Sequence, residues 1–208
     1  MQYSVLGSSA VKVSRVCLGS MTWGCQNNQL DADAQLDYAL AQGVNFIDTA
    51  EIYAIPPTAE TYGATERIIG NYLQRSAGKR QQIILASKMA GPGLAYVRGG
   101  GDMTGQTLLQ AVDGSLARLQ TDYIDLYQTH WPDHGLAYDE TMEVLDELVR
   151  SGKVRVLGCS NETSYGLMKS LATSERLGVA RSHHDMRARC GKRFCRGRAN
   201  TAACARDE

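Results

Sequence analysis

Four polar side chains follow apolar, strand-like segments of the sequence, and together they have the chemistry needed to protonate a carbonyl. Asp48 and Tyr53 lie in NFIDTAEIY, Lys88 lies in QIILASKMAG, and His130 lies in DYIDLYQTH. A phenol is a weak acid with a free pKa of about 10, and a nearby ammonium group favours its ionised form. Such a phenol can give its proton to a carbonyl oxygen while the carbonyl carbon accepts a hydride.

The other three side chains have roles that complement the phenol. Lys88 would lower the pKa of Tyr53 if the two strand ends meet, and Asp48 would hold Lys88 by a charge-assisted hydrogen bond. His130 can point a ring nitrogen at the substrate oxygen and orient it. Each residue alone also fits a turn cap, a solvated charge or a packed aromatic, so the functional interpretation depends on their joint placement.

A hydroxyl and an amide follow the next strand-like segment along the chain. Ser160 and Asn161 come directly after VRVLGC. Their side chains are suited to hydrogen bonds with the carboxamide group of a nicotinamide. Together with the four residues above, they predict a site at which a nicotinamide meets a carbonyl.

The elements that would position these residues alternate in type. Residues 3–6 and 11–13 predict a small β-hairpin around a Gly-Ser-Ser turn. Five strand–helix units follow, with expected strands at 16–18, 44–47, 83–86, 123–127 and 154–157 and expected helices at 31–42, 65–75, 104–119, 138–151 and 167–178. Asp31 or Asp33 would cap the first helix, and Gly43 would end it. This alternation predicts a parallel sheet with right-handed crossovers.

Two architectures are compatible with five such units. An open doubly wound sheet would have a glycine-rich phosphate turn after its first strand, but the sequence there reads LGSMTWG, without GxGxxG. A barrel would place reactive side chains at the C-terminal ends of several strands, which matches the pattern above. We therefore predict an α/β fold of the (β/α)8 TIM-barrel type, incomplete at about five units, with an N-terminal β-hairpin.

Five motifs in order give the sequence a specific family resemblance over about residues 3–180. They read GSMTWG, FIDTAEIYAIP with YGATERIIGNYL, ILASKMAG, SLARLQTDYIDLYQTHWPD and SGKVRVLGCSNET. The chain resembles the aldo-keto reductase superfamily, in particular its bacterial Tas-like and potassium-channel β-subunit-like branch. The resemblance implies an eight-stranded barrel and NADPH-dependent reduction of aldehydes or ketones.

The resemblance also implies a role for each candidate residue. Tyr53 would be the proton donor, tuned by Lys88 and Asp48, and His130 would steer the substrate. The nicotinamide would be held by the pair Ser160 and Asn161. Trp23, in the loop after the first strand, would line the cofactor or substrate pocket, or equally would pack at the barrel rim.

The sequence departs from the family pattern after residue 180. Residues 181–208 hold seven Arg, three Cys and two His and no Leu, Ile or Val, a composition that cannot bury enough apolar surface to fold alone. Three interpretations remain open: a zinc site of unusual spacing, a basic arm for anionic partners, and an out-of-frame translation, which the abrupt onset favours. We expect residues 1–180 to be the N-terminal part of the barrel and 181–208 to be a disordered or frameshifted tail.

A truncated barrel has expected consequences for binding and assembly. Three strands with their helices, and most of the surface that binds the NADPH phosphates, would be missing. Unpaired strand edges would favour self-association of the chain. We expect weak NADPH binding and little reductase activity from the 208-residue chain.

Composition narrows the classes of partner and compartment. The 22 basic and 22 acidic residues balance, which favours neither nucleic acid nor an anionic membrane as a partner. No apolar run reaches the length of a membrane span, and the N-terminus does not resemble a secretion signal. The cysteines before residue 180 form no CxxC pair. These features predict a cytoplasmic protein without a metal site. Two alternatives to an active reductase remain, a non-catalytic regulatory subunit of the same fold and a non-functional pseudogene product.

Overall fold

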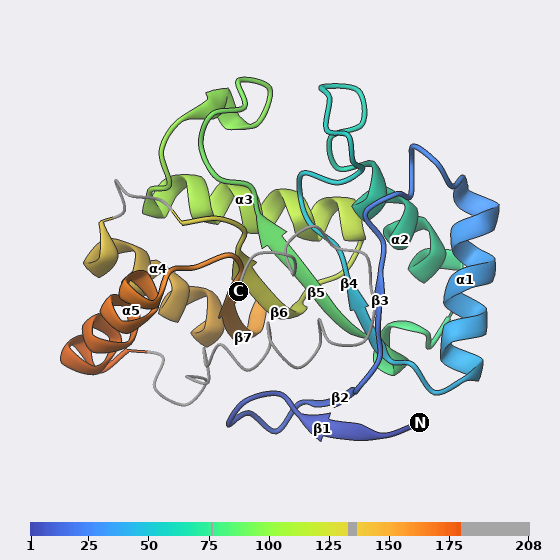
Figure 1. Ribbon diagram of the computed structural model, residues 1–208, viewed down its shortest axis with the longest axis horizontal. Helices are drawn as coiled ribbons and strands as arrows, with labels where there is room; N and C mark the ends of the chain where they lie inside the picture. The colour runs from blue at the N-terminus through green and yellow to red at the C-terminus, as the bar shows by residue number, and fades with distance from the viewer. Residues whose placement is uncertain (76, 133–136, 180–208) are drawn as a thin grey trace.

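The described part of the computed structural model covers residues 1–75, 77–132 and 137–179, and its centre is a five-stranded parallel sheet (Figure 1). The strands are β3 (Cys17–Gly19), β4 (Phe46–Asp48), β5 (Ile84–Met89), β6 (Ile124–Thr129) and β7 (Val154–Cys159). They lie side by side in the order of the sequence. A doubly wound sheet reverses its strand order, whereas a barrel does not, so the barrel prediction is confirmed for these five units.

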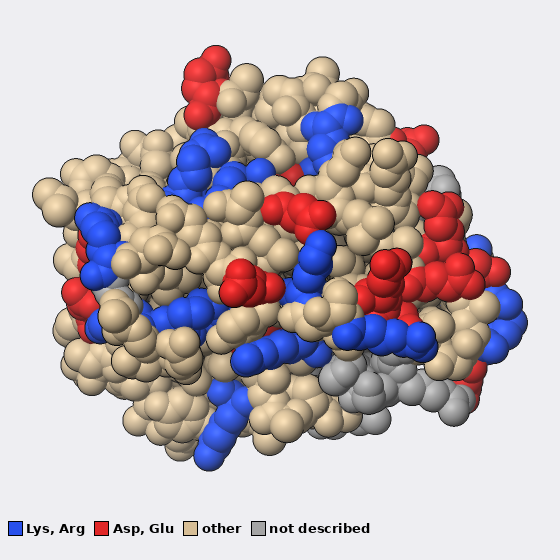
Figure 2. Space-filling model, turned by 180° about the vertical axis from the view of Figure 1, so that it is seen from behind, with Lys and Arg blue, Asp and Glu red and all other residues tan. Residues whose placement is uncertain are grey.

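One helix follows each strand, and the helices form an arc around the sheet (Figure 1). They are α1 (Gln29–Ala41), α2 (Ala64–Arg75), α3 (Gly105–Leu119), α4 (Tyr138–Arg150) and α5 (Ser164–Leu177), with short 3-10 turns η1 (Arg80–Gln82) and η2 (Arg98–Gly100) in the loops. Figure 2 shows basic and acidic side chains interspersed over the rear face, which agrees with the balanced composition.

Alternating side chains on each strand pack into two separate cores. Ile47, Leu85, Tyr127 and Leu157 belong to the cluster that contains the apolar faces of the helices. Their neighbours along the chain belong to a second cluster on the opposite face of the sheet, namely Phe46, Ala86, Leu126 and Val156. This two-residue alternation is the side-chain period of a β-strand.

The predicted hairpin is confirmed and lies below the amino-terminal ends of the strands (Figure 1). It consists of β1 (Tyr3–Val5) and β2 (Lys12–Ser14), which pair antiparallel. Leu6 and Val13 pack into the second cluster, against strand residues such as Phe46. The hairpin therefore covers one end of the sheet, and the opposite end, where the strands finish, is left for the candidate site.

The prediction for the start of α1 needs correction. The cap of α1 is Asn28, whose side chain accepts from the Asp31 backbone N–H, while Asp31 returns the bond to Asn28 in a capping box. Asp31 is therefore the third helical residue and not the cap, because a helix with this reciprocal pair begins at the earlier polar residue. Gly43, with a φ of 78°, directly follows the last turn and so ends the helix as expected.

The strands also extend further than their apolar runs. β5 continues through Lys88, because Lys88 and Met89 pair with Gln128 and Thr129 of β6. Asp48 is likewise the last residue of β4 and pairs with Ala86. Polar side chains end an apolar pattern but not a backbone ladder, so Asp48 and Lys88 lie on strands and not in the loops after them.

In the described residues, β3 and β7 are the outer strands of the sheet, and association of copies through them stays a prediction. The division at residue 180 also stays a prediction, since residues 180–208 lie outside the described part. No helix in residues 1–75, 77–132 and 137–179 is long and apolar enough to cross a membrane.

Candidate active site

The carboxyl ends of β4 and β5 bring two predicted residues into direct contact. Lys88 Nζ donates to Asp48 Oδ2 at 2.7 Å and to the backbone oxygen of Thr49 at 2.9 Å. Lys88 is 6% exposed. Burial disfavours its ammonium form, but Asp48 and then Tyr53 outweigh that effect, and the pKa of Lys88 is raised. Lys88 is therefore a fixed positive charge at this edge of the sheet.

Tyr53 lies over this charge, in the loop between β4 and α2. Lys88 Nζ is 5.1 Å from the centre of the Tyr53 ring. Burial raises the pKa of the phenol, Lys88 lowers it and Asp48 raises it, and the net direction is upward. Lys88 thus acts in the expected direction, but desolvation of the buried phenol is the stronger effect. At neutral pH the phenol carries its proton.

His130 follows β6 and completes a contiguous group of four residues. Its ring meets that of Tyr53 edge-on, with centroids 5.7 Å apart. Burial and, second, the charge of Lys88 lower the pKa of His130 to about 3, so the imidazole is neutral over the physiological range. Its Nδ1 atom is buried and has no hydrogen-bond partner among the residues that the structure describes. A buried polar atom of this kind is available to a bound group.

Ser160 and Asn161 follow β7, next to His130. The backbone N–H of Ser160 donates to Thr129 O at 2.8 Å, which aligns the ends of β6 and β7. Asn161 Nδ2 donates to His130 O at 2.9 Å and to Ser160 Oγ at 3.2 Å. Since its amide nitrogen is committed to the protein, the Asn161 amide oxygen is the atom left to accept a hydrogen bond.

Trp23 is placed apart from these six residues. It is 1% exposed and belongs to the core beneath the helices. Its indole Nε1 donates to Gln35 Oε1 of α1 at 3.0 Å, and its backbone oxygen accepts from Thr65 Oγ1 of α2 at 2.7 Å. These contacts correspond to the packing role considered for Trp23, and the structure does not bring it to the other candidates.

Three residues at the site were missed from the sequence. Trp131 stacks on His130 with centroids 3.9 Å apart and is 39% exposed, and an aromatic directly after the histidine was the available signal. Gln128 pairs with Lys88 in the sheet and shares the face of His130, two residues later. Glu51 is fully buried within the apolar run before Tyr53, a placement that marks a carboxylate with specific partners.

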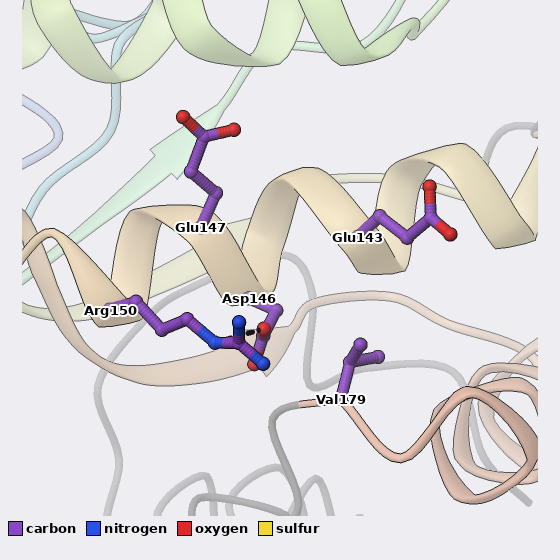
Figure 3. A pocket seen from close by; sticks show the side chains of 5 residues that line it. All are labelled: Glu143, Asp146, Glu147, Arg150 and Val179. Carbon is purple, nitrogen blue, oxygen red and sulfur yellow. Dashed lines mark ion pairs between the residues drawn. The ribbon is translucent and has the colours of Figure 1, made fainter.

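A hollow elsewhere on the surface lies between α4 and Val179, two residues after the end of α5. It is lined by Glu143, Asp146, Glu147, Arg150 and Val179 (Figure 3). The Arg150 guanidinium pairs with Asp146 at 2.6 Å across one helical turn. None of the candidate residues lines it. In residues 1–75, 77–132 and 137–179 no cluster of His, Cys, Asp and Glu is arranged to bind a metal.

A parallel barrel-type sheet whose strand ends assemble a tyrosine, a lysine, an aspartate and a histidine is the arrangement that the family resemblance implied. The family model described as "Aldo/keto reductase family" matches residues 15–185. The chain therefore belongs to the aldo/keto reductase family.

Three relatives with similar sequences are bacterial proteins. "Protein tas" of Escherichia coli is 41% identical over 201 residues, which covers 87% of this chain and 58% of the relative. "Uncharacterized oxidoreductase YrpG" of Bacillus subtilis is 38% identical over 190 residues, covering 88% and 57%. "6-dehydroglucose reductase" of Novosphingobium aromaticivorans is 41% identical over 161 residues, covering 76% and 51%. The chain thus spans little more than half the length of these relatives.

Proposed function

We propose that this chain carries the catalytic residues of an NADPH-dependent reductase of aldehydes or ketones. The observation that supports this most directly is that buried Lys88, paired with the partly exposed Asp48, lies against the Tyr53 ring. The family supports an oxidoreductase in general terms. The choice of NADPH, the direction of reaction and the roles of single residues are our proposal.

In this proposal Tyr53 is the general acid. Its phenol gives a proton to the carbonyl oxygen, and the negative charge left on Tyr53 is stabilised by Lys88. Asp48 and Thr49 O hold the ammonium in place through the bonds at 2.7 and 2.9 Å. Because burial keeps the phenol protonated at neutral pH, the acid is in the form that reduction requires.

His130 orients the substrate. A neutral imidazole carries one N–H, which can donate to the carbonyl oxygen without competing as an acid. The low pKa of His130, about 3, results chiefly from burial and keeps the ring neutral. Trp131, stacked on the histidine, would cover one side of the same pocket.

The end of β7 fits a nicotinamide carboxamide. The Asn161 amide oxygen accepts from an amide N–H, and the Ser160 hydroxyl can donate or accept. When bound, the reduced nicotinamide supplies the hydride. The cytoplasm, where NADPH is abundant and thiols stay reduced, is the compartment that we propose.

The test compares turnover in wild type and Tyr53→Phe. We expect weak NADPH-dependent reduction of a panel of small aldehydes and ketones, measured at high NADPH concentration, with kcat lower by about a further 10²–10⁴-fold in the variant. Tyr38→Phe is the matched control, since Tyr38 lies on α1 and is 69% exposed, and its kcat should equal that of wild type. Wild-type turnover no higher than that of Tyr53→Phe would contradict the proposal and favour a non-catalytic role.

A further inference from the structure

Glu51, two residues before Tyr53, is the centre of a buried polar network. It is 0% exposed. Glu51 Oε1 accepts from Tyr62 OH at 2.7 Å and pairs with the Arg98 guanidinium, while Glu51 Oε2 accepts from the Ala90 backbone N–H at 2.9 Å. A fully buried carboxylate is tolerated only when it is paired and hydrogen-bonded in this way.

Two partners of Glu51, Ala90 and Arg98, come from a different loop. Ala90 directly follows β5, and Arg98 lies eight residues further on in the same loop, where it also donates to Ala90 O at 2.9 Å. The loop that carries Tyr53 is thereby connected to the loop of residues 90–103. Both loops stand above the carboxyl ends of the strands in Figure 1.

Arg98 adopts a backbone conformation that its side chain disfavours. Its φ is 48°, and those of Gly99 and Gly100 are 77° and 72°. A non-glycine residue in this region is disfavoured, because its Cβ lies too close to the carbonyl oxygen that follows. Since glycines fill the next positions, the arginine is kept here by what its guanidinium binds, which is Glu51 and Ala90 O.

The same two loops enclose the phenol. Tyr53 packs in one apolar cluster with Ala50 and Ile52 from its own loop and with Ala90 and Val97 from the other. Val97 immediately precedes Arg98. The ion pair therefore ties together the two segments whose apolar side chains surround Tyr53.

We propose that Glu51 and Arg98 are positioning residues, which hold the Tyr53 loop against the loop of residues 90–103 so that the phenol stays beside Lys88. This inference rests on the proposed function. Neither residue touches the reacting atoms in this proposal, and both act through the location of Tyr53. The rival explanation is an ion pair that contributes only to stability.

The experiment uses Glu51→Gln, which keeps the side-chain shape, and Arg98→Gly, which removes the guanidinium and suits the left-handed backbone. Asp125→Asn is the matched control, because Asp125 is also 0% exposed and also pairs with arginine, but far from Tyr53 in the amino-terminal part of β6. Lys88, Asp48 and His130, the ionisable groups around the phenol, are unchanged in every variant.

The first readout is the titration of Tyr53, obtained from near-ultraviolet absorbance as the difference between each protein and its Tyr53→Phe derivative. Burial raises the pKa of this phenol in the wild type, so a released loop that admits water should lower the phenol pKa. We expect this in Glu51→Gln and Arg98→Gly but not in Asp125→Asn. An unchanged titration in the first two, or an equal shift in all three, would overturn the proposal.

The second readout is kinetic. A displaced acid should lower kcat by about tenfold to 10²-fold in Glu51→Gln and Arg98→Gly and change KM less than twofold. Equal losses in Asp125→Asn would overturn the proposal in favour of general destabilisation. The titration needs no substrate, so a wild type without turnover would contradict the proposed function alone, and the titration would still decide the role of Glu51 and Arg98.

Discussion

The two ends of the sheet each contain a carboxylate paired with a cation, and they differ in how completely their buried polar atoms are hydrogen-bonded. In the amino-terminal part of β6, Asp125 accepts from Arg80 and from Arg155 at 2.8 Å each and from the Leu85 backbone N–H at 3.0 Å. The two guanidinium groups lie 3.8 and 3.9 Å from the centre of the Tyr123 ring. This cluster has the geometry of a structural anchor.

At the carboxyl end of the sheet, the buried polar atoms are less completely hydrogen-bonded. Lys88 is bound by Asp48 and Thr49 O, but the buried Nδ1 of His130 has no hydrogen-bond partner in the described part of the chain. The Asp48 side chain is 23% exposed, against 0% for Asp125. All the polar contacts of the Asp125 cluster are made within the fold, whereas the Lys88 cluster leaves a polar atom of His130 available to a bound group. We infer that the Asp125 cluster stabilises the scaffold that positions the Lys88 cluster.

The largest expected effect is the loss of stability on disrupting the Asp125 cluster. Asp125→Asn leaves Arg80, whose side chain is 11% exposed, and Arg155 without their counter-charge, and we expect the free energy of unfolding to fall by about 3–5 kcal/mol. Urea unfolding followed by circular dichroism measures it. Asp113→Asn is the control, since Asp113 and Lys153 form a surface pair whose side chains are 57% and 40% exposed, and we expect a loss below about 1 kcal/mol. Equal losses in the two variants would remove the contrast between the ends.

The opposite result is expected when the cation at the carboxyl end of the sheet is removed. Lys88→Met replaces a buried ammonium by an apolar side chain of similar length. Because the Asp48 side chain is 23% exposed and can be solvated, the free energy of unfolding should change by less than about 1 kcal/mol. Turnover should fall by about 10²-fold, because the phenolate of Tyr53 loses its stabilising charge. Lys12→Met is the control, since Lys12 lies 5.8 Å from the ring of Tyr3 on the hairpin. A large stability loss with unchanged turnover in Lys88→Met would reverse the comparison.

The sequence predicted the elements well because each has a local signal. Thr104 caps α3 as expected, with its side chain bonded to the Thr107 N–H, and Gly178 ends α5 with a φ of 67°. The start of α1 was placed too late because Asp31 and Asn28 are both good caps, and only the reciprocal bond decides between them.

The site was predicted in part, for a physical reason. Reactive residues at successive strand ends converge in a barrel, and this rule brings Asp48, Lys88 and His130 together. The network around Glu51 depends instead on loop residues such as Arg98, 47 positions away, and no periodic pattern links them. The net rise in the pKa of Tyr53 was likewise not predictable, because it depends on burial in the folded loop.

The smallest expected effect is the contribution of His130 to the pH dependence of the free energy of unfolding. Its pKa of about 3 in the folded protein lies below the unfolded value of about 6.5, so the unfolded state binds the extra proton first. The contribution of the neutral ring is complete above pH about 6.5 and is lost progressively as the pH falls toward the folded pKa, reaching about 2 kcal/mol at pH about 5. His130→Gln cannot titrate there, so wild type should lose about that much more stability than the variant between pH 7 and 5 in urea unfolding. Parallel pH profiles of wild type and His130→Gln would show that the histidine is solvated. The carboxyl end of the sheet would then be as accessible to water as an ordinary protein surface.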